Sequence, residues 1–322
     1  MPKQRATYKI TNWQTYNKSL LKRGDINLWL SPDVLKDWQS KEVPKRRGRP
    51  KYYSDGLIEL CLMVKHIYKL PYRATEGFIK SLFKQLKLNI AIPSYSQLSR
   101  RAEKLLCKLQ RVFNCKGPID IAVDSTGLKV YGEGEWKIRQ HGIGKRRTWR
   151  KLHLAVDPLD HEIVACKLTD NSRTDEEIFP GLLNQIEDKI EHCFGDGAYD
   201  KKRCYQSSYT KQAKLIVPPN IRAKEQKEKL PELDIRDTAI RRIKTLHEQD
   251  GDKELARKQW KYEQDYHCRS IAETAMFRFK TLFSDRLSCR KMQTQITETM
   301  IKLNLMNQMT ALGMPIPSVT YS

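Results

Sequence analysis

The sequence predicts an α/β protein in two parts, an α-helical amino-terminal part and a larger part built on a mixed β-sheet. Three observations predict this organisation. Up to about residue 115 apolar residues recur at helical spacing. From Pro118 onward β-rich runs end at turn residues. Later segments alternate between helical and strand patterns, as expected when helices cover a sheet. We therefore expect one domain at residues 1–115 and a second at 116–322.

The chain starts with short helical segments. Residues 12–23 form one such segment, and Gly24 after it is suited to a left-handed helix cap. Ser31 and Pro32 are typical of a helix start, with a capping hydroxyl followed by proline in the first turn.

Three further helices are expected at residues 57–67, 73–86 and 94–106. The last of them carries Arg100 and Arg101 on its exposed side. Three short helices with a basic last member resemble a helix-turn-helix unit that reads DNA. A plain helical bundle with a solvated basic face is the alternative.

A basic run at residues 45–51 contains an Arg-Gly-Arg-Pro core with Arg47 and Arg49. Other DNA-binding proteins insert such a core into an A·T-rich minor groove. A solvated basic linker fits the same residues. The run is therefore a candidate DNA contact and no more.

The second part begins with three strands, expected at residues 119–130, 149–156 and 163–168. Strands that follow one another so closely predict an antiparallel meander. Thr174 and Glu177 are spaced as a capping box, so a helix is expected from there to about residue 190.

The remaining segments complete the sheet. Residues 194–198 are expected to end a short strand, and a helix at 201–212 and a compact apolar strand at 215–217 follow. The order β-β-β-α-β-α-β-α is that of the ribonuclease H-like fold, in which the first and fourth strands are neighbours. A charged stretch at about 220–260 is expected to be an inserted, partly helical subdomain. Two final helices are expected at residues 269–283 and 293–312.

The charge of the chain favours a polyanionic partner. Sixty Lys and Arg residues against 38 Asp and Glu give a net charge of +22, which indicates nucleic acid. No basic amphipathic helix stands apart, so a membrane surface is disfavoured.

The eight cysteines form no Cys-x-x-Cys pair, and no signal peptide or membrane-spanning stretch is evident. We therefore expect a soluble cytoplasmic protein with reduced cysteines. The adjacent pairs His192-Cys193 and His267-Cys268 have the wrong spacing for tetrahedral zinc.

Two aspartates have the context of a functional site. Asp124 lies inside the first strand in the string IAVDST, where an unpaired buried carboxylate is costly and calls for a cation. Asp196 closes another strand in the string FGDGAYD, whose glycines allow backbone or phosphate to come close. Neighbouring first and fourth strands would bring these carboxylates together, and two like charges require a divalent metal or a shared proton.

A third acid is expected from the helix that contains Glu273. At about 100° per residue, Tyr266, Arg269, Glu273 and Lys280 share one face. The neighbouring apolar stripe, which would dock the helix on the sheet, comprises Ala272, Met276, Phe279 and Phe283. A purely structural network of salt bridges among these charged residues is the alternative.

These residues carry a resemblance to a known family. The spacing Tyr266-x2-Arg269-x3-Glu273-x6-Lys280 resembles the signature of bacterial insertion-sequence DDE transposases. The string VDSTGLK around Asp124 and the string DGAYD are similar to other motifs of that group. The resemblance spans about residues 118–314. It assigns no role to the charged stretch.

The resemblance implies an insertion-sequence DNA transposase in the bacterial cytoplasm, associated with the nucleoid. Such an enzyme would bind terminal inverted repeats, cleave DNA by metal-dependent hydrolysis and join the 3′-hydroxyl ends to target DNA by transesterification. Asp124, Asp196 and Glu273 would hold two Mg²⁺ ions, for which Mn²⁺ could substitute.

Tyr266, Arg269 and Lys280 would contact the DNA and its phosphates. The partners implied are double-stranded DNA, both element ends and target, and further copies of the chain, at least a dimer in the synaptic complex. Two other classes stay open: a non-catalytic DNA-binding protein descended from a transposase, and a general metal-dependent nuclease.

Overall fold

The computed structural model describes residues 6–30, 32–39, 52–114, 117–130, 149–227 and 230–321. It divides into two compact units, one made of Met1–Val112 with Lys291–Ser322 and the other of Phe113–Arg290. The expected residues Ser31, Arg47 and Arg49 lie outside the described residues.

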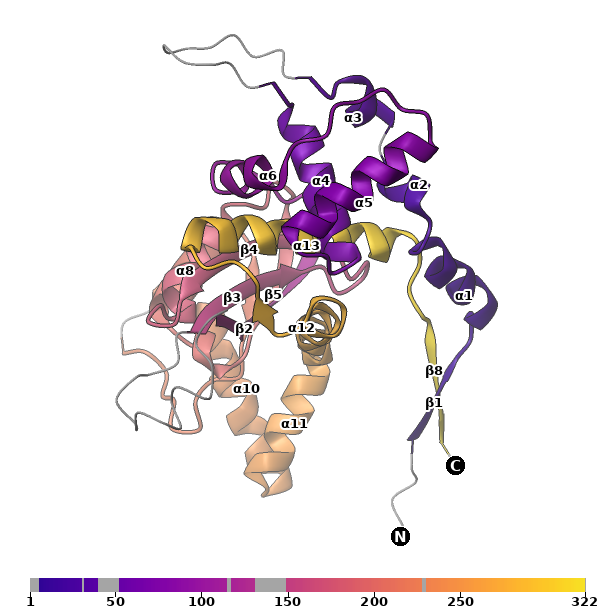
Figure 1. Cartoon of the computed structure of the whole chain (residues 1–322). Helices are drawn as coiled ribbons and strands as arrows, with labels where there is room; N and C mark the ends of the chain where they lie inside the picture. Colours follow the sequence, from indigo (N-terminus) through magenta and orange to yellow (C-terminus); the bar gives the residue numbers. More distant parts are fainter. Residues whose placement is uncertain are drawn as a thin grey trace, which may run out of the picture. The chain divides into compact units, whose positions relative to one another are not determined.

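The second unit contains a six-stranded mixed sheet with the order β4-β3-β2-β5-β6, and β7 pairs with β2. Strands β2, β3 and β4 form the expected antiparallel meander, while β5 runs parallel to β2 beside it (Figure 1). The first and fourth strands of the unit are thus neighbours, as expected. The strands are β2 (Ile119–Val130), β3 (Trp149–Val156), β4 (Ile163–Asp170), β5 (Ile190–Phe194), β6 (Lys214–Ile216) and β7 (Arg286–Leu287).

Helices alternate with the later strands, which completes the order β-β-β-α-β-α-β-α and confirms the ribonuclease H-like fold. One hydrophobic core joins β2 residues such as Ile121 and Val123 to Phe179 and Leu182 of α8. Because side chains alternate along a strand, Asp124 points to the other face of the sheet from Val123. The helices are α8 (Asp175–Leu183), α9 (Lys202–Thr210), α10 (Asp234–Asp250), α11 (Lys253–Glu263) and α12 (Ser270–Phe283), with 3-10 turns η1 (Gly197–Tyr199), η2 (Pro231–Leu233) and η3 (Tyr266–Arg269).

The charged insertion forms a helical hairpin of α10 and α11 (Figure 1). Gly251 reverses the chain between the two helices with a φ of 71°, a conformation that glycine adopts without strain. On α12, the expected apolar stripe is buried at Ala272, Met276, Phe279 and Phe283. This helix packs against β2 and β3.

The first unit is a helical assembly around α4, which contacts α3, α5, α6 and α13. Its core includes Leu57, Ile58 and Cys61, all fully buried on α4. The elements are β1 (Ala6–Ile10), α1 (Trp13–Lys22), α2 (Ile26–Trp29), α3 (Pro32–Lys36), α4 (Asp55–Ile67), α5 (Tyr72–Gln85), α6 (Tyr95–Ala102), α13 (Met292–Ala311) and β8 (Pro317–Tyr321). None of the helices that the structure describes is long and apolar enough to cross a membrane.

The chain divides between Val112 and Phe113, close to the expected boundary at residue 115, and a second time before Lys291. The carboxyl-terminal segment belongs to the amino-terminal unit, because α13 packs against α4 and α6 and β8 pairs with β1. The amide of Asn304 on α13 also binds the segment before the second unit, accepting from the Gln110 N–H and donating to the Lys108 carbonyl, both at 2.9 Å. The apolar pattern of a helix says that it is buried, not against which partner.

Several local expectations are wrong. Among the described glycines only Gly251 and Gly313 have positive φ, so Gly24 forms no left-handed cap. The expected capping box does not form: Thr174 makes no side-chain capping hydrogen bond, and the carboxylate of Glu177 pairs with Arg173. Helix α8 ends at Leu183 and α6 at Ala102, both earlier than expected.

Candidate active site

Asp124 lies in the middle of β2 with its carboxylate mostly shielded from solvent. Its Oδ1 accepts a hydrogen bond of 2.7 Å from the backbone N–H of Ser125. Burial is the main cause that raises the pKa of Asp124, and the charges of Asp196 and Glu273 raise it further, against the opposing effects of Ser125 and Arg269. The charges of the two other expected acids therefore both reach Asp124.

Asp196 is brought to the same level as Asp124 by the register of the parallel strands. Ala122 of β2 pairs with Phe194 of β5, and each acid follows two residues later. Strand β5 ends at Phe194, earlier than expected, so Asp196 stands just beyond the strand and does not close it. There its Oδ1 caps η1 by accepting from the Ala198 N–H at 2.9 Å.

Gly195, directly before Asp196, is needed for close packing. A Cβ at this position would lie 3.0–3.2 Å from ring and Cβ atoms of Tyr199. The ring of Tyr199 is almost fully buried and packs against Phe179 with 5.5 Å between ring centroids. The absence of a side chain at Gly195 thus allows the backbone directly before Asp196 to pack closely against Tyr199.

Arg269 links the first acid to the third. Its Nη1 lies 3.4 Å from Oδ2 of Asp124, and its Nη2 lies 2.5 Å from Oε1 of Glu273. The salt bridge between Arg269 and Glu273 was the structural alternative, and it does form. Lys280 does not join this network, since it makes no ion pair with any residue that the structure describes.

Tyr266 connects the beginning of this helical segment to the strand that precedes Asp196. Its hydroxyl donates a hydrogen bond of 3.1 Å to the carbonyl of Gly195. Two cations lie over its ring, Lys261 at 5.4 Å and Arg269 at 6.0 Å from the centroid. Burial, the largest cause, raises the pKa of Tyr266 to about 12. The hydroxyl is therefore protonated near neutral pH and acts as a donor to the Gly195 carbonyl.

A polar network that sequence reasoning missed anchors the strand beside Asp124. His153 is fully buried on β3, and its Nδ1 and Nε2 lie 3.0 Å from Asp175 Oδ1 and Thr169 Oγ1. Lys151 donates to Asp175 at 2.7 Å. Burial alone would raise the pKa of Asp175, but hydrogen bonds from His153, Lys151 and Ser125 hold it well below its usual range. The histidine pairs in register with Ser125, the residue after Asp124.

The donor set of the three acids fits a hard divalent ion. Carboxylate oxygens without sulfur or imidazole favour Mg²⁺ or Mn²⁺. The hydroxyl of Tyr199 is buried without a hydrogen-bond partner among the described residues. The acids whose charges act on it are Asp175, Asp124 and Asp196. The Tyr199 hydroxyl could therefore donate a hydrogen bond to a water molecule that an ion at these carboxylates would hold.

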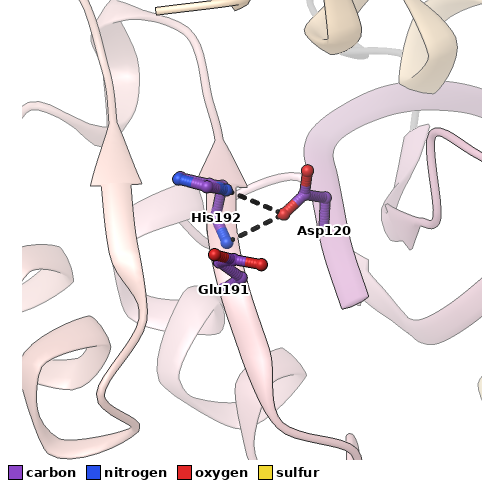
Figure 2. Close-up of side chains that lie close together, drawn as sticks. All are labelled: Asp120, Glu191 and His192. Carbon is purple, nitrogen blue, oxygen red and sulfur yellow. Dashed lines mark hydrogen bonds and ion pairs between the residues drawn. The ribbon is translucent and has the colours of Figure 1, made fainter. Parts of the chain in front are cut away.

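A separate group with metal-ligand chemistry lies elsewhere on the same two strands. Ligand atoms of Asp120, Glu191 and His192 all lie within 4.8 Å of one another. Figure 2 shows Asp120 Oδ1 accepting from the backbone N–H of His192 at 3.0 Å, with the ring Nδ1 at 2.9 Å. Asp120 precedes Asp124 by four residues, about 13 Å along a strand. The group thus lies toward the amino-terminal ends of β2 and β5, whereas ligand sites of such sheets lie at the carboxyl ends.

The basic residues expected to read DNA have different environments. Arg101 forms an ion pair with Asp55 and donates to the Tyr53 carbonyl at 3.1 Å, so it ties α6 to the start of α4. Arg100 is exposed and bonds only to the Ser96 carbonyl of its own helix, at 3.2 Å, among the described residues. Of the two, Arg100 has the freer guanidinium.

Comparison with known proteins adds a family. Two family profiles, both described as "Transposase DDE domain", match residues 21–133 and 116–307, and the second covers more than half of the chain. An uncharacterized protein of Aquifex aeolicus (strain VF5) is 25% identical over 250 residues, which cover 72% of this chain and 69% of that one.

Two solved structures are also similar to the chain. The Drosophila P element transposase strand transfer complex matches at 11% identity and a TM-score of 0.30, covering 92% of this chain and 85% of that one. The Mos1 strand transfer complex matches at 11% identity and a TM-score of 0.22, covering 72% and 81%. The fold assignment depends on the sheet topology described above, not on these two likenesses.

Proposed function

Because the chain belongs to the transposase DDE domain family, we propose that it is the DNA transposase of an insertion sequence. It binds the terminal inverted repeats of its element, cleaves the DNA by metal-dependent hydrolysis and joins the 3′-hydroxyl ends to target DNA by transesterification. Joining two ends requires at least two copies of the chain in the reacting complex. The working place of such an enzyme is the nucleoid in the bacterial cytoplasm.

The observation that carries this proposal is the convergence of three acids: the strand register brings Asp196 level with Asp124, and Arg269 binds both Asp124 and Glu273. They come from β2, from the end of β5 and from α12. These three carboxylates would hold two Mg²⁺ ions, which supply activation of the attacking oxygen and stabilisation of the leaving oxygen. Mn²⁺ would serve in their place.

The other residues of the site bind and orient the DNA. Arg269 forms ion pairs with Asp124 and Glu273, and its planar guanidinium suits a phosphate equally well. Lys280 on the same helix adds a second cation without an ion-pair partner among the described residues. Tyr266 keeps the backbone before Asp196 in place through the Gly195 carbonyl. Because water and then the 3′-hydroxyl would be the attacking groups, the proposal needs no covalent enzyme intermediate.

DNA end recognition is assigned to the amino-terminal unit. The exposed Arg100 on α6 is the candidate contact to bases or phosphates, and Arg47 and Arg49 are candidates for the minor groove. Arg101 lies on the same helix, α6, and this position is the reason to propose it as a DNA contact. Its guanidinium already forms an ion pair with Asp55. Net positive charge supports DNA as the partner.

The experiment uses an end-labelled duplex carrying the terminal repeat that flanks the gene. Purified protein is incubated with it in EDTA, Ca²⁺, Mg²⁺ or Mn²⁺, and the products are resolved on a denaturing gel. We expect a nick with a free 3′-hydroxyl at the element boundary in Mg²⁺ and Mn²⁺, and binding with little cleavage in Ca²⁺. An equal nick in EDTA would contradict the metal mechanism.

Matched variants separate the proposed site from the neighbouring group. Asp124→Asn, Asp196→Asn and Glu273→Gln each abolish cleavage while DNA binding persists. Asp120→Asn, which lies on the same strand in the other group, retains cleavage. Full activity of any of the first three removes that residue from the site. Equal cleavage of scrambled DNA indicates a general nuclease, and binding without any cleavage indicates a non-catalytic descendant.

A further inference from the structure

The helical insertion is anchored next to the proposed active site. Trp260 of α11 is almost fully buried in a hydrophobic cluster with Phe194 of β5 and Ile243 of α10. Tyr266 packs against the same cluster. Phe194 precedes Asp196 by two residues, so the last turn of α11 has a fixed place relative to the second acid.

Lys261, the residue after Trp260, places its ammonium group over the ring of Tyr266. Its Nζ lies 5.4 Å from the ring centroid of Tyr266, whose hydroxyl binds the Gly195 carbonyl at 3.1 Å. The same ring also has Arg269 close to it, with the guanidinium carbon 6.0 Å from the centroid. An ammonium over a ring keeps N–H donors for a further acceptor.

No acid among the described residues neutralises Lys261. The closest acid along its own helix, Glu263, is bound by Arg242 through two hydrogen bonds of 2.7 and 2.9 Å. Arg269, by contrast, is occupied by Asp124 and Glu273. Lys261 is thus a half-buried cation over the ring of Tyr266, and no ion pair with a described residue neutralises its charge.

We propose that Lys261 binds a backbone phosphate of the DNA strand next to the scissile phosphate. The charged insertion then has a function: it completes the strand-binding surface beside the acids. This inference rests on the proposed function, since it takes the substrate of the same site to be DNA. The competing explanation is that Lys261 only stabilises the position of the Tyr266 ring.

The test compares Lys261→Met with a matched control on the same helix. Methionine keeps the apolar stem and loses the charge, and Lys261→Arg retains a cation that stacks on an aromatic ring. Lys258→Met removes an exposed lysine one turn earlier that makes no ion pair or side-chain hydrogen bond with another described residue. Binding of the full-length protein to the terminal-repeat duplex is measured in Ca²⁺ at several salt concentrations.

We expect Lys261→Met to reduce the slope of log affinity against log salt by about one, the loss of one phosphate contact. Lys261→Arg keeps the slope, and so does Lys258→Met. In Mg²⁺, KM for the duplex rises in Lys261→Met more than kcat falls. An unchanged slope in Lys261→Met, with only a lower melting temperature, assigns the residue to Tyr266 positioning and overturns the proposal. An equal loss of slope in Lys258→Met overturns it too.

The binding measurement separates this proposal from the proposed function. If the wild-type protein binds the duplex but never cleaves it in Mg²⁺ or Mn²⁺, the catalytic proposal fails. The salt slopes of the variants still decide whether Lys261 contacts a phosphate. If the wild-type protein has no affinity for DNA at low salt, both proposals fail together.

Discussion

Arg269 and Asp124, separated by 145 positions in the sequence, form an ion pair of 3.4 Å between Nη1 and Oδ2. The same guanidinium reaches Glu273. Because Asp124 has other acids close by, the arginine supplies the positive charge that a divalent ion would supply in the working enzyme. In the proposed site, arginine and metal would therefore compete for the same carboxylate oxygens.

This competition predicts the behaviour of Arg269→Ala. Without the guanidinium, repulsion among the acids lowers stability by about 1 kcal/mol in EDTA, a small loss because Glu273 is more than half exposed. Added Mg²⁺ or Ca²⁺ then raises the melting temperature more than in the wild-type protein. Thermal melts across a metal titration measure both effects.

The control for Arg269→Ala is Arg173→Ala. It removes a surface ion pair with Glu177, which is not one of the three proposed metal ligands. This variant should show the wild-type response to metal. Identical metal-induced shifts in Arg269→Ala and the wild-type protein would mean that the arginine does not compete with an ion.

The second prediction concerns the glycines on either side of Asp196. Gly195→Ala places a methyl group 3.0–3.2 Å from Tyr199, whose ring is held by Phe179 and cannot withdraw easily. Such overpacking costs about 1–3 kcal/mol and displaces the acid that follows, so cleavage falls with stability. Gly197→Ala meets nothing within 4 Å and should behave as the wild-type protein. Chemical denaturation and the cleavage assay check both variants, and equal stabilities would contradict the argument.

The sheet was predictable because its information is local. Within residues 119–130 and 149–156, apolar side chains either alternate with polar ones or follow one another directly. The structure has strands with these bounds. The order of the elements then specifies which strands are neighbours, so the expectation that β2 and β5 pair is confirmed. The residues proposed for the metal follow from that pairing and from family motifs, not from local pattern alone.

Contacts between distant segments could not be predicted. The pairs His153–Asp175 and Arg101–Asp55 join residues 22 and 46 positions apart, and no spacing rule links them. Lys261 looked like one of many charges in a segment without a motif, and only the burial of Trp260 beside it fixes its place. The assignment of α13 to the amino-terminal unit likewise depends on packing partners that its sequence does not specify.

The third prediction separates a structural tyrosine from a nucleophilic one. Tyr266→Phe removes the hydrogen bond to the Gly195 carbonyl and lowers stability by about 0.5–1.5 kcal/mol. The ring that carries Lys261 and Arg269 remains. Since the pKa of Tyr266 is about 12, no tyrosinate is available near neutral pH and the variant still cleaves. Complete loss of cleavage with a normal melting temperature would instead indicate covalent attack by the hydroxyl.

The last prediction concerns His66, which is buried on α4 in the first unit. Burial, followed by the charge of Lys65, lowers its pKa from 6.5 to about 3, while Glu298 opposes and Lys302 adds to the shift. Between these two pH values the unfolded chain binds a proton that the folded chain does not. Stability is therefore complete above about pH 6.5 and is lost as the pH falls, by about 2 kcal/mol from pH 7 to pH 5 for this one group.

The variant His66→Gln cannot take up the proton and lacks this part of the pH dependence. We expect it to be less stable than the wild-type protein at pH 7, because a buried side chain is changed, and the difference to shrink by about 2 kcal/mol at pH 5. Urea unfolding followed by circular dichroism at several pH values measures the difference. His267→Gln, which alters a side chain that is 79% exposed, serves as the control and should follow the wild-type curve. Parallel curves for His66→Gln and the wild-type protein would show that His66 is protonated alike in the folded and unfolded chains.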